Sequence, residues 1–177
     1  FGSPEPHGPT RVRARDLNIG IELCTFLGTF LIDYQEGYIK FDVEVRESEI
    51  RKNNLIVIGG PGVNIIAEKI NNKLPIRFAK KVNGRYLGIY SEFSKRFYEE
   101  ETQGIVEKFR NPYNKSKWVL LIAGKRYSGT RAAILSLIKH LKDVCKGNKY
   151  NKSISAHVIE GIDTDYDGII DDAIILE

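Results

Sequence analysis

The residues best suited to chemistry form an acidic run near the end of the sequence, from Asp163 to Asp172. The first half of this run matches D-x-D-x-D-G, the start of a calcium-binding loop. Calcium is a hard cation that takes about six to eight oxygen ligands, and carboxylates two residues apart can converge on one point. Gly168 permits the sharp turn that brings the next backbone carbonyl inward. The expected metal ligands are the carboxylates of Asp163, Asp165, Asp167 and Asp171 and the carbonyl of Ile169.

The acidic run departs from an EF-hand at its end and at its flanks. Ile174 stands where a bidentate Glu would complete an EF-hand loop, and the flanking residues are typical of strands rather than helices. The sequence therefore predicts a structural Ca²⁺ site outside an EF-hand, with a dissociation constant of about 10⁻⁴ to 10⁻³ M. A solvated acidic turn without metal is the alternative.

Two glycine-rich turns, Gly59–Gly62 and Gly124–Thr130, each follow an apolar run and precede a helical pattern. Such turns can present backbone amides to a phosphate. However, Pro61 removes one amide, the first turn lacks the third glycine of G-x-G-x-x-G, and Thr130 stands where a P-loop has Lys. Ser128 is expected to cap the second helix. We predict structural turns, no catalytic or cofactor-binding residues and no small-molecule substrate; a nucleotide- or phosphate-binding enzyme is an alternative.

The most apolar stretch, residues 17–32, repeats large side chains at helical spacing. It is bounded by Asp16 and Asp33 and is shorter than the roughly 20 apolar residues that a membrane-spanning helix needs. We therefore expect a buried helix and no membrane span.

Further along, residues 39–45 alternate apolar and charged side chains, which predicts a half-buried strand, and a polar connection is expected over 47–54. Residues 54–70 and 118–141 then repeat one unit: an apolar strand, a glycine turn and a helix. This repetition predicts that the two strands lie parallel in one sheet, adjacent or nearly so, with helical crossovers.

Asn83-Gly84 lies between two β-rich runs, 76–82 and 85–90, and predicts a hairpin. The sequence closes with a strand over 155–160, the acidic loop and a strand over 173–176. The expected fold class is α/β: a mixed, mainly parallel sheet flanked by helices, with a hairpin insertion and a C-terminal strand–acidic loop–strand.

Residues 1–15 are rich in Pro, Gly and Arg and are predicted to be a linker or arm, followed by a single domain over 16–177. The absence of Met indicates that the sequence is a piece of a longer or processed product. The lack of Met together with the low Gln content is a composition seen in proteins of hyperthermophiles. Cys24 and Cys145 lie far apart and are expected to be buried free thiols, although a disulfide would also be compatible.

Charge is unevenly distributed along the 177 residues. All 27 Lys and Arg precede Glu160, whereas residues 160–177 hold seven acidic residues and no base. Basic residues interleave with aromatic ones over 80–97. This basic part predicts weak, salt-sensitive and non-specific binding of nucleic acid.

Four segments together resemble the C-terminal or outer domain of archaeal surface-layer (S-layer) proteins: LIVIGGPGVNIIAEKI, GIVEKFRNPYNKSKWVLLIAG, SGTRAA and VIEGIDTDYDGIIDDAIILE. The resemblance implies a non-catalytic structural or interaction domain in a cell-surface lattice, which associates with itself or with other protein domains. The acidic loop would then hold a metal ion between two strands. The basic arm before residue 16 leaves an alternative open: the scaffolding or sensory half of an intracellular archaeal protein, such as a DNA-binding regulator, in the cytoplasm.

Overall fold

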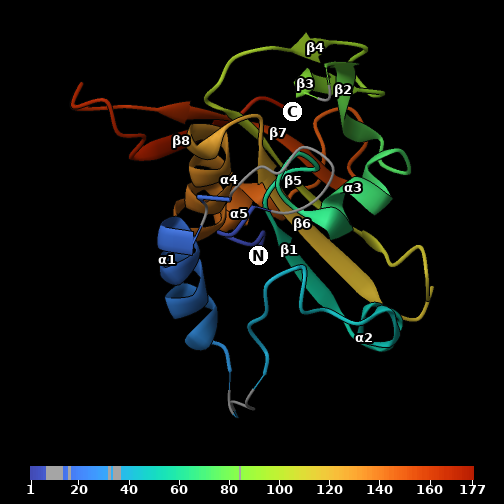
Figure 1. The fold of residues 1–177 in the computed structure, drawn as a ribbon. Helices are drawn as coiled ribbons and strands as arrows, with labels where there is room; N and C mark the ends of the chain where they lie inside the picture. The colour runs from blue at the N-terminus through green and yellow to red at the C-terminus, as the bar shows by residue number, and fades with distance from the viewer. Residues whose placement is uncertain (7–13, 16, 32, 34–36, 84) are drawn as a thin grey trace.

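The computed structural model of the chain contains two β-sheets and five helices in the described part of the chain (Figure 1), namely residues 1–6, 14–15, 17–31, 33, 37–83 and 85–177. The larger sheet has five strands in the order β1-β6-β5-β7-β8. Their bounds are Leu55–Ile58 (β1), Trp118–Gly124 (β6), Gln103–Arg110 (β5), Ser155–Ile162 (β7) and Asp172–Ile175 (β8).

The two strand–glycine–helix units meet as the sequence predicts. β1 and β6 are neighbours and run parallel, with Leu55 opposite Val119 and Ile58 opposite Ile122. The remaining pairs of this sheet, β5–β6, β5–β7 and β7–β8, are antiparallel. The expectation of a mixed α/β sheet is therefore confirmed, but a mainly parallel sheet is wrong. The reason is the short connection over 111–117, which can only form a hairpin and so turns β6 back along β5.

The predicted hairpin is present and belongs to a separate sheet. β2 and β3 pair antiparallel, with Val82 opposite Arg85 across the turn, and Asn83 has a φ of 47°. A short strand, β4, extends the pair to a three-stranded sheet in the order β2-β3-β4. These strands cover Ile76–Val82 (β2), Arg85–Ser91 (β3) and Phe97–Tyr98 (β4).

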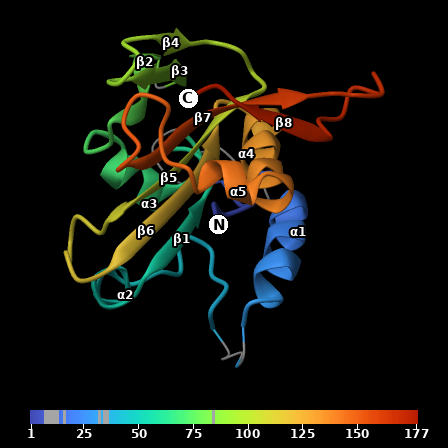
Figure 2. The same ribbon diagram turned by 180° about the vertical axis from the view of Figure 1, so that it is seen from behind.

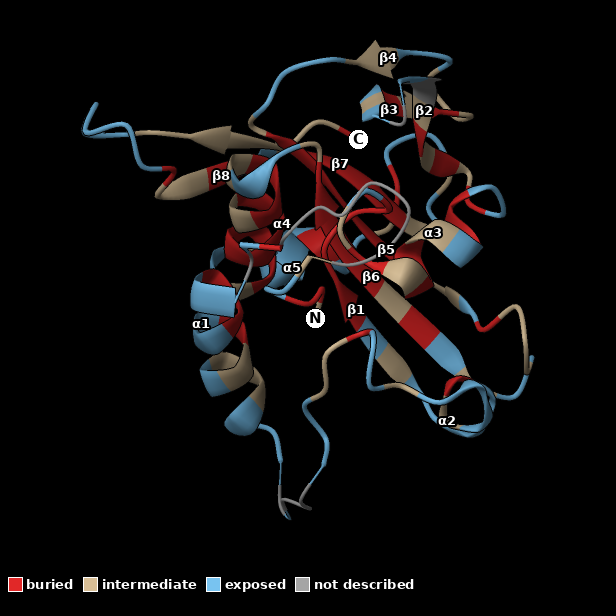
Figure 3. Cartoon of the chain, viewed as in Figure 1, coloured by how far each residue is buried: buried red, intermediate tan, exposed pale blue. Residues whose placement is uncertain are grey.

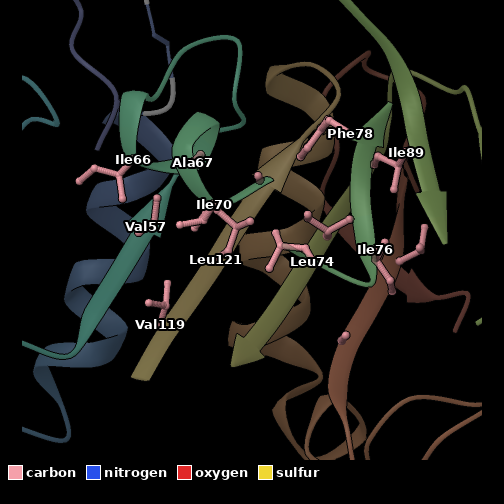
Figure 4. Close-up of a cluster of buried hydrophobic side chains, with 14 of the residues drawn as sticks. Val57, Ile66, Ala67, Ile70, Leu74, Ile76, Phe78, Ile89, Val119 and Leu121 are labelled. Carbon is pink, nitrogen blue, oxygen red and sulfur yellow. The ribbon is translucent and has the colours of Figure 1, made fainter. Parts of the chain in front are cut away.

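Each face of the large sheet has its own hydrophobic core. One core joins β1, β5, β6 and β7 to α3 (Ile65–Asn71) and to the small sheet, and its side chains interdigitate in Figure 4. The second core packs the opposite face against α4 (Tyr127–Lys139), α5 (Leu141–Val144) and α1 (Leu17–Gly28) (Figure 2). Fully burying one Val, Leu or Ile side chain contributes about 1.5–3 kcal/mol. The sheet is therefore held from both sides, and its edges and ends are free to carry loops.

The apolar helix α1 is shorter and more exposed than the sequence predicts. It ends at Gly28, and only Ile19, Gly20 and Leu23 are buried. Ile21 is 60% exposed, because α1 contacts α4 along one side only. No helix within the described residues has the length and apolar character needed to cross a membrane.

The strand expected over 39–45 does not form. The alternation there was misleading because Asp42, placed on the polar side of the pattern, is buried. Its carboxylate accepts hydrogen bonds from the backbone N–H groups of Ser3 (2.9 Å) and Ile65 (2.7 Å), and its own N–H donates to the carbonyl of Phe1 (2.7 Å), so isolated contacts and not a strand ladder hold this segment. The expected polar connection contains a short helix, α2 (Glu47–Lys52).

The first residues of the predicted arm pack against the domain. The backbone N–H of Gly2 donates to the carbonyl of Ile58 (3.3 Å), and Ser3 is buried. Residues 7–13 lie outside the described part of the chain. The first three residues thus contact the domain, whereas the linker or arm over 1–15 and the domain boundary at residue 16 stay predictions.

Candidate metal-binding loop

The acidic run forms the connection between β7 and β8 and projects from one end of the large sheet, where it is red in Figure 1. The two strands pair up to Ile162 opposite Asp172, which fixes both ends of the loop. Ile170 is buried at the base of the loop, in the core that also contains α4. The loop is therefore anchored by an apolar side chain while its acidic residues remain at the surface.

Three of the predicted ligands converge. Carboxylate oxygens of Asp163, Asp165 and Asp171 lie within 4.8 Å of one another. Gly168 has a φ of 88°, the left-handed conformation expected for the turn, and its N–H donates to Oδ2 of Asp163 (2.8 Å). This arrangement could supply several oxygen ligands to a hard cation.

Asp171 is held in place by the start of the loop. Thr164 donates twice to its carboxylate, from the backbone N–H (3.1 Å) and from Oγ1 (2.6 Å). These hydrogen bonds, foremost the one from the Thr164 side chain, lower the pKa of Asp171 below its ordinary value. Asp171 is thus ionised at neutral pH. As the last residue of the loop, it is hydrogen-bonded to Thr164, the second residue.

The two other predicted ligands, Asp167 and Ile169, are not in the converging group. Oδ1 of Asp167 accepts a hydrogen bond from the N–H of Ile169 (2.7 Å). The N–H of Asp167 is also directed inward, to Asp163 and Asp165 (3.2 Å each). Backbone amides of the loop thus donate some of the hydrogen bonds that its carboxylates accept. An acidic turn without metal would show the same pattern.

Basic residues of α4 support the C-terminal end of the loop, and the sequence reasoning missed them. Nε of Arg131 donates to the carbonyl of Ile170, and Nζ of Lys139 donates to the carbonyl of Asp171. His140 pairs with Asp172 at 2.7 Å, and this hydrogen bond lowers the pKa of Asp172 below its ordinary value. The sequence signal for these contacts was the spacing of Arg131 and Lys139. The two lie about two helical turns apart, which places them on one side of the helix.

The second glycine turn serves close packing. A Cβ on Gly129 would lie 2.0 Å from the carbonyl oxygen of Gln103, and Gly124 is equally close to the backbone of Thr130. Oγ1 of Thr130 accepts from the N–H of Gly124 (3.0 Å). The expected helix cap is wrong, since Ser128 lies inside α4 and its hydroxyl donates to the carbonyl of Glu101 (2.8 Å). Glycine is therefore required at positions 124 and 129 because strands β5 and β6 pack closely against α4.

The remaining sequence candidates do not assemble into a site. Cys24 and Cys145 are both free thiols; Cys145 is exposed and Cys24 is half-buried, so the expectation of two buried thiols is wrong. Burial raises the pKa of Cys24 above its ordinary value. Of the aromatic residues proposed as stacking platforms for nucleic acid, Tyr86 and Phe93 pack against the first core.

Comparison with known proteins identifies the family. The sequence matches the S-layer like family, outer domain, over residues 33–141, which is more than half of the chain. The chain belongs to the S-layer like family. The matched region runs from before α2 to the start of α5, so the β7–β8 hairpin and its acidic loop lie beyond it. The family resemblance expected from the sequence is thereby confirmed.

A curated relative of this S-layer like domain is an uncharacterised protein, MJ0954, of Methanocaldococcus jannaschii. The two sequences are 30% identical over 90 residues, which cover 51% of this chain and 17% of the relative. The aligned part is thus a small fraction of that protein. This relative supports the archaeal origin expected from the sequence. No solved structure matches the chain significantly.

Proposed function

We propose that this domain is a non-catalytic structural module of a cell-surface lattice, in which it associates with copies of itself. The observation that carries the proposal is the family match over residues 33–141. The structure is compatible with it, because the second glycine turn is engaged in close packing through Gly124 and Gly129 and the large sheet leaves loops exposed at both ends. A lattice component needs such rigid support for exposed contact surfaces.

Within this module, the β7–β8 loop is proposed to bind one structural Ca²⁺. The converging carboxylates of Asp163, Asp165 and Asp171 support this proposal. Asp167 and the carbonyl of Ile169 stay in the proposed ligand set, because small rotations of a surface loop can bring further oxygens to the ion. The ion would neutralise repulsion between neighbouring carboxylates and tie β7 to β8. Its role would be mechanical, since no catalytic group accompanies it in the described part of the loop.

Sedimentation velocity on the full chain tests the structural role. The sedimentation coefficient is expected to rise with protein concentration, and a monomer that persists up to about 1 mM, the range of weak association, would contradict the proposal. A thermal-shift screen against nucleotides and phosphoesters tests the absence of catalysis, and a saturable shift with ATP, GTP or NAD would contradict it.

Melting curves in millimolar calcium and in chelator test the metal site separately. At calcium 100 times the dissociation constant, the folded state gains about 2.7 kcal/mol. Two coincident curves, with no ion carrying oxygen ligands at about 2.4 Å in a calcium-soaked crystal, would reduce the loop to an acidic turn.

A further inference from the structure

The large sheet has an open end on the face that α4 covers. Val106 and Ile122 pair on this face and are buried in the core that contains α4 residues. Further along β5 and β6, away from the acidic loop, the same face becomes exposed, and no described helix crosses it in Figure 2. We call this surface the open end, and its residues are Ile56, Lys108, Arg110, Trp118 and Leu120.

The open end combines apolar surface with positive charge. The guanidinium carbon of Arg110 lies 3.9 Å from the centroid of the Trp118 ring, and Nζ of Lys108 lies 5.1 Å from it. Ile56, on the neighbouring strand β1, is 47% exposed, and the exposed ends of these strands are pale blue in Figure 3. Aromatic and Arg side chains are enriched at protein interfaces, so this surface is suited to a partner that is apolar and acidic.

The β7–β8 loop has the complementary composition. Tyr166 at its tip is 92% exposed, with a φ of 63° that turns it outward between Asp165 and Asp167. Ile169 is also exposed. The tip therefore offers an aromatic ring flanked by carboxylates. It is complementary in charge to the open end, where the Trp118 ring is flanked by Lys108 and Arg110.

The loop cannot reach the open end of its own chain. At one end of β5, Gln103 pairs with Glu160 close to the loop; at the other end, Arg110 pairs with Trp118. Eight residues of strand separate the two by about 25 Å. Figures 1 and 2 both show the loop and the β5–β6 turn at opposite ends of the molecule.

We infer that the tip of the β7–β8 loop of one copy docks on the open end of a second copy. This inference rests on the proposed structural function, which it deepens by naming the contact. Two different surfaces meet, so an assembly keeps one unused loop tip at one end and one unused open end at the other. Such head-to-tail contacts generate open chains or rings, unlike a two-fold dimer.

Two variants of the full chain test the contact by sedimentation velocity. Lys108→Glu combined with Arg110→Glu reverses the charge of the open end, where both side chains are exposed. Tyr166→Lys changes the tip without touching a proposed metal ligand, and Lys95 shows that Lys adopts a φ of 58° in this chain. Each variant alone should weaken self-association by about tenfold or more, and Lys142→Glu on exposed α5 surface should not.

Mixing the two variants gives the sharper result. The first keeps an intact tip and the second keeps an intact open end, so together they should form a 1:1 dimer that cannot grow. Wild-type protein should form longer species at the same concentration, and these should shrink as salt screens the charges. A mixture that stays monomeric, while wild type associates, overturns the inference.

The remaining outcomes also separate the two proposals. If wild type associates and both variants associate equally well, this contact is wrong but the structural function stands. If wild type never associates, both proposals fail. If a labelled oligonucleotide binds at about 0.2 M salt, loses binding in the Lys108/Arg110 variant, and self-association is unaffected, then the open end is a nucleic-acid surface and the inference is overturned.

Discussion

The carboxyl group of Glu107, on β5, accepts a hydrogen bond from the backbone N–H of Ile76, the first residue of β2, with 3.0 Å between Oε1 and N. This contact joins the five-stranded sheet to the three-stranded sheet at a position without access to water. The second oxygen of Glu107 has no hydrogen-bond partner among the described residues. Burial raises the pKa of Glu107 well above its ordinary value of 4.5. Burial between the two sheets therefore favours the neutral form of this glutamic acid.

This neutral acid predicts a stability that falls as the pH rises. The folded state keeps a proton that the unfolded state releases above pH 4.5, so the contribution of Glu107 is greatest below that pH and is lost as the pH rises through the folded pKa. The loss should approach about 1.4 kcal/mol per pH unit within this window. Glu107→Gln keeps the acceptor for Ile76 but cannot ionise. Its stability relative to wild type should therefore increase as the pH rises above about 4.5, up to the folded pKa of Glu107.

Denaturant unfolding of both proteins across this pH range measures the difference. Glu100→Gln, which changes an exposed carboxylate, is the matched control and should show no such trend. If Glu107→Gln destabilises the fold by the same amount at every pH, the side chain is ionised in the folded state and the prediction is wrong.

The calcium response should depend on Asp163 in the loop and not on Asp172, the first residue of β8. Asp163→Asn should abolish the gain in melting temperature on adding calcium, because Asp163 belongs to the converging group. Asp172→Asn should retain the gain, since Asp172 is paired with His140 instead. Isothermal titration of both variants with calcium checks this. Equal responses would show that the effect is non-specific screening by a divalent cation.

The tight approach of α4 to β5 should make Gly129 intolerant of a side chain. In Gly129→Ala the new Cβ would meet backbone of Gln103 at 2.0 Å, so strand or helix must shift. Overpacking of this kind costs about 1–3 kcal/mol or more. Gly62→Ala, in the other glycine turn, has nothing within 4 Å of the added Cβ and should be nearly neutral. Chemical denaturation compares the two, and equal effects would contradict a packing role for the second turn.

The base of the loop should depend on Arg131. Arg131→Met retains much of the aliphatic packing but leaves the carbonyl of Ile170 without its donor. A lost hydrogen bond to a charged group costs about 1.5–3 kcal/mol. Lys142→Met, on the exposed surface, is the control. Hydrogen exchange should become faster at the amides of β8 in the first variant only; unchanged protection would show that apolar contacts of Ile170 alone hold the loop.

Sequence periodicity was sufficient where one local pattern decides the structure. The repeated strand–glycine–helix unit predicted the parallel pair β1–β6, although α3 leads from β1 into the three-stranded sheet and not directly back to β6. Asn83 marked the β2–β3 hairpin through its backbone preference. The D-x-D-x-D-G spacing located the loop between two strands, since that spacing depends on residues close in sequence.

Contacts between distant residues decided the rest, because periodicity carries no information about them. Asp42 lies on the polar side of an alternating pattern, yet it is buried against Ser3 and Ile65, and so no strand forms. Glu107 also looked like the polar side of a strand, but the three-stranded sheet covers it, and this burial raises its pKa well above the ordinary value. Which carboxylates of the loop converge depended on Gly168 and Thr164, whose hydrogen bonds place Asp163 and Asp171. The sequence determined which segments could form elements, whereas burial and side-chain hydrogen bonds between segments determined which polar residues face inward.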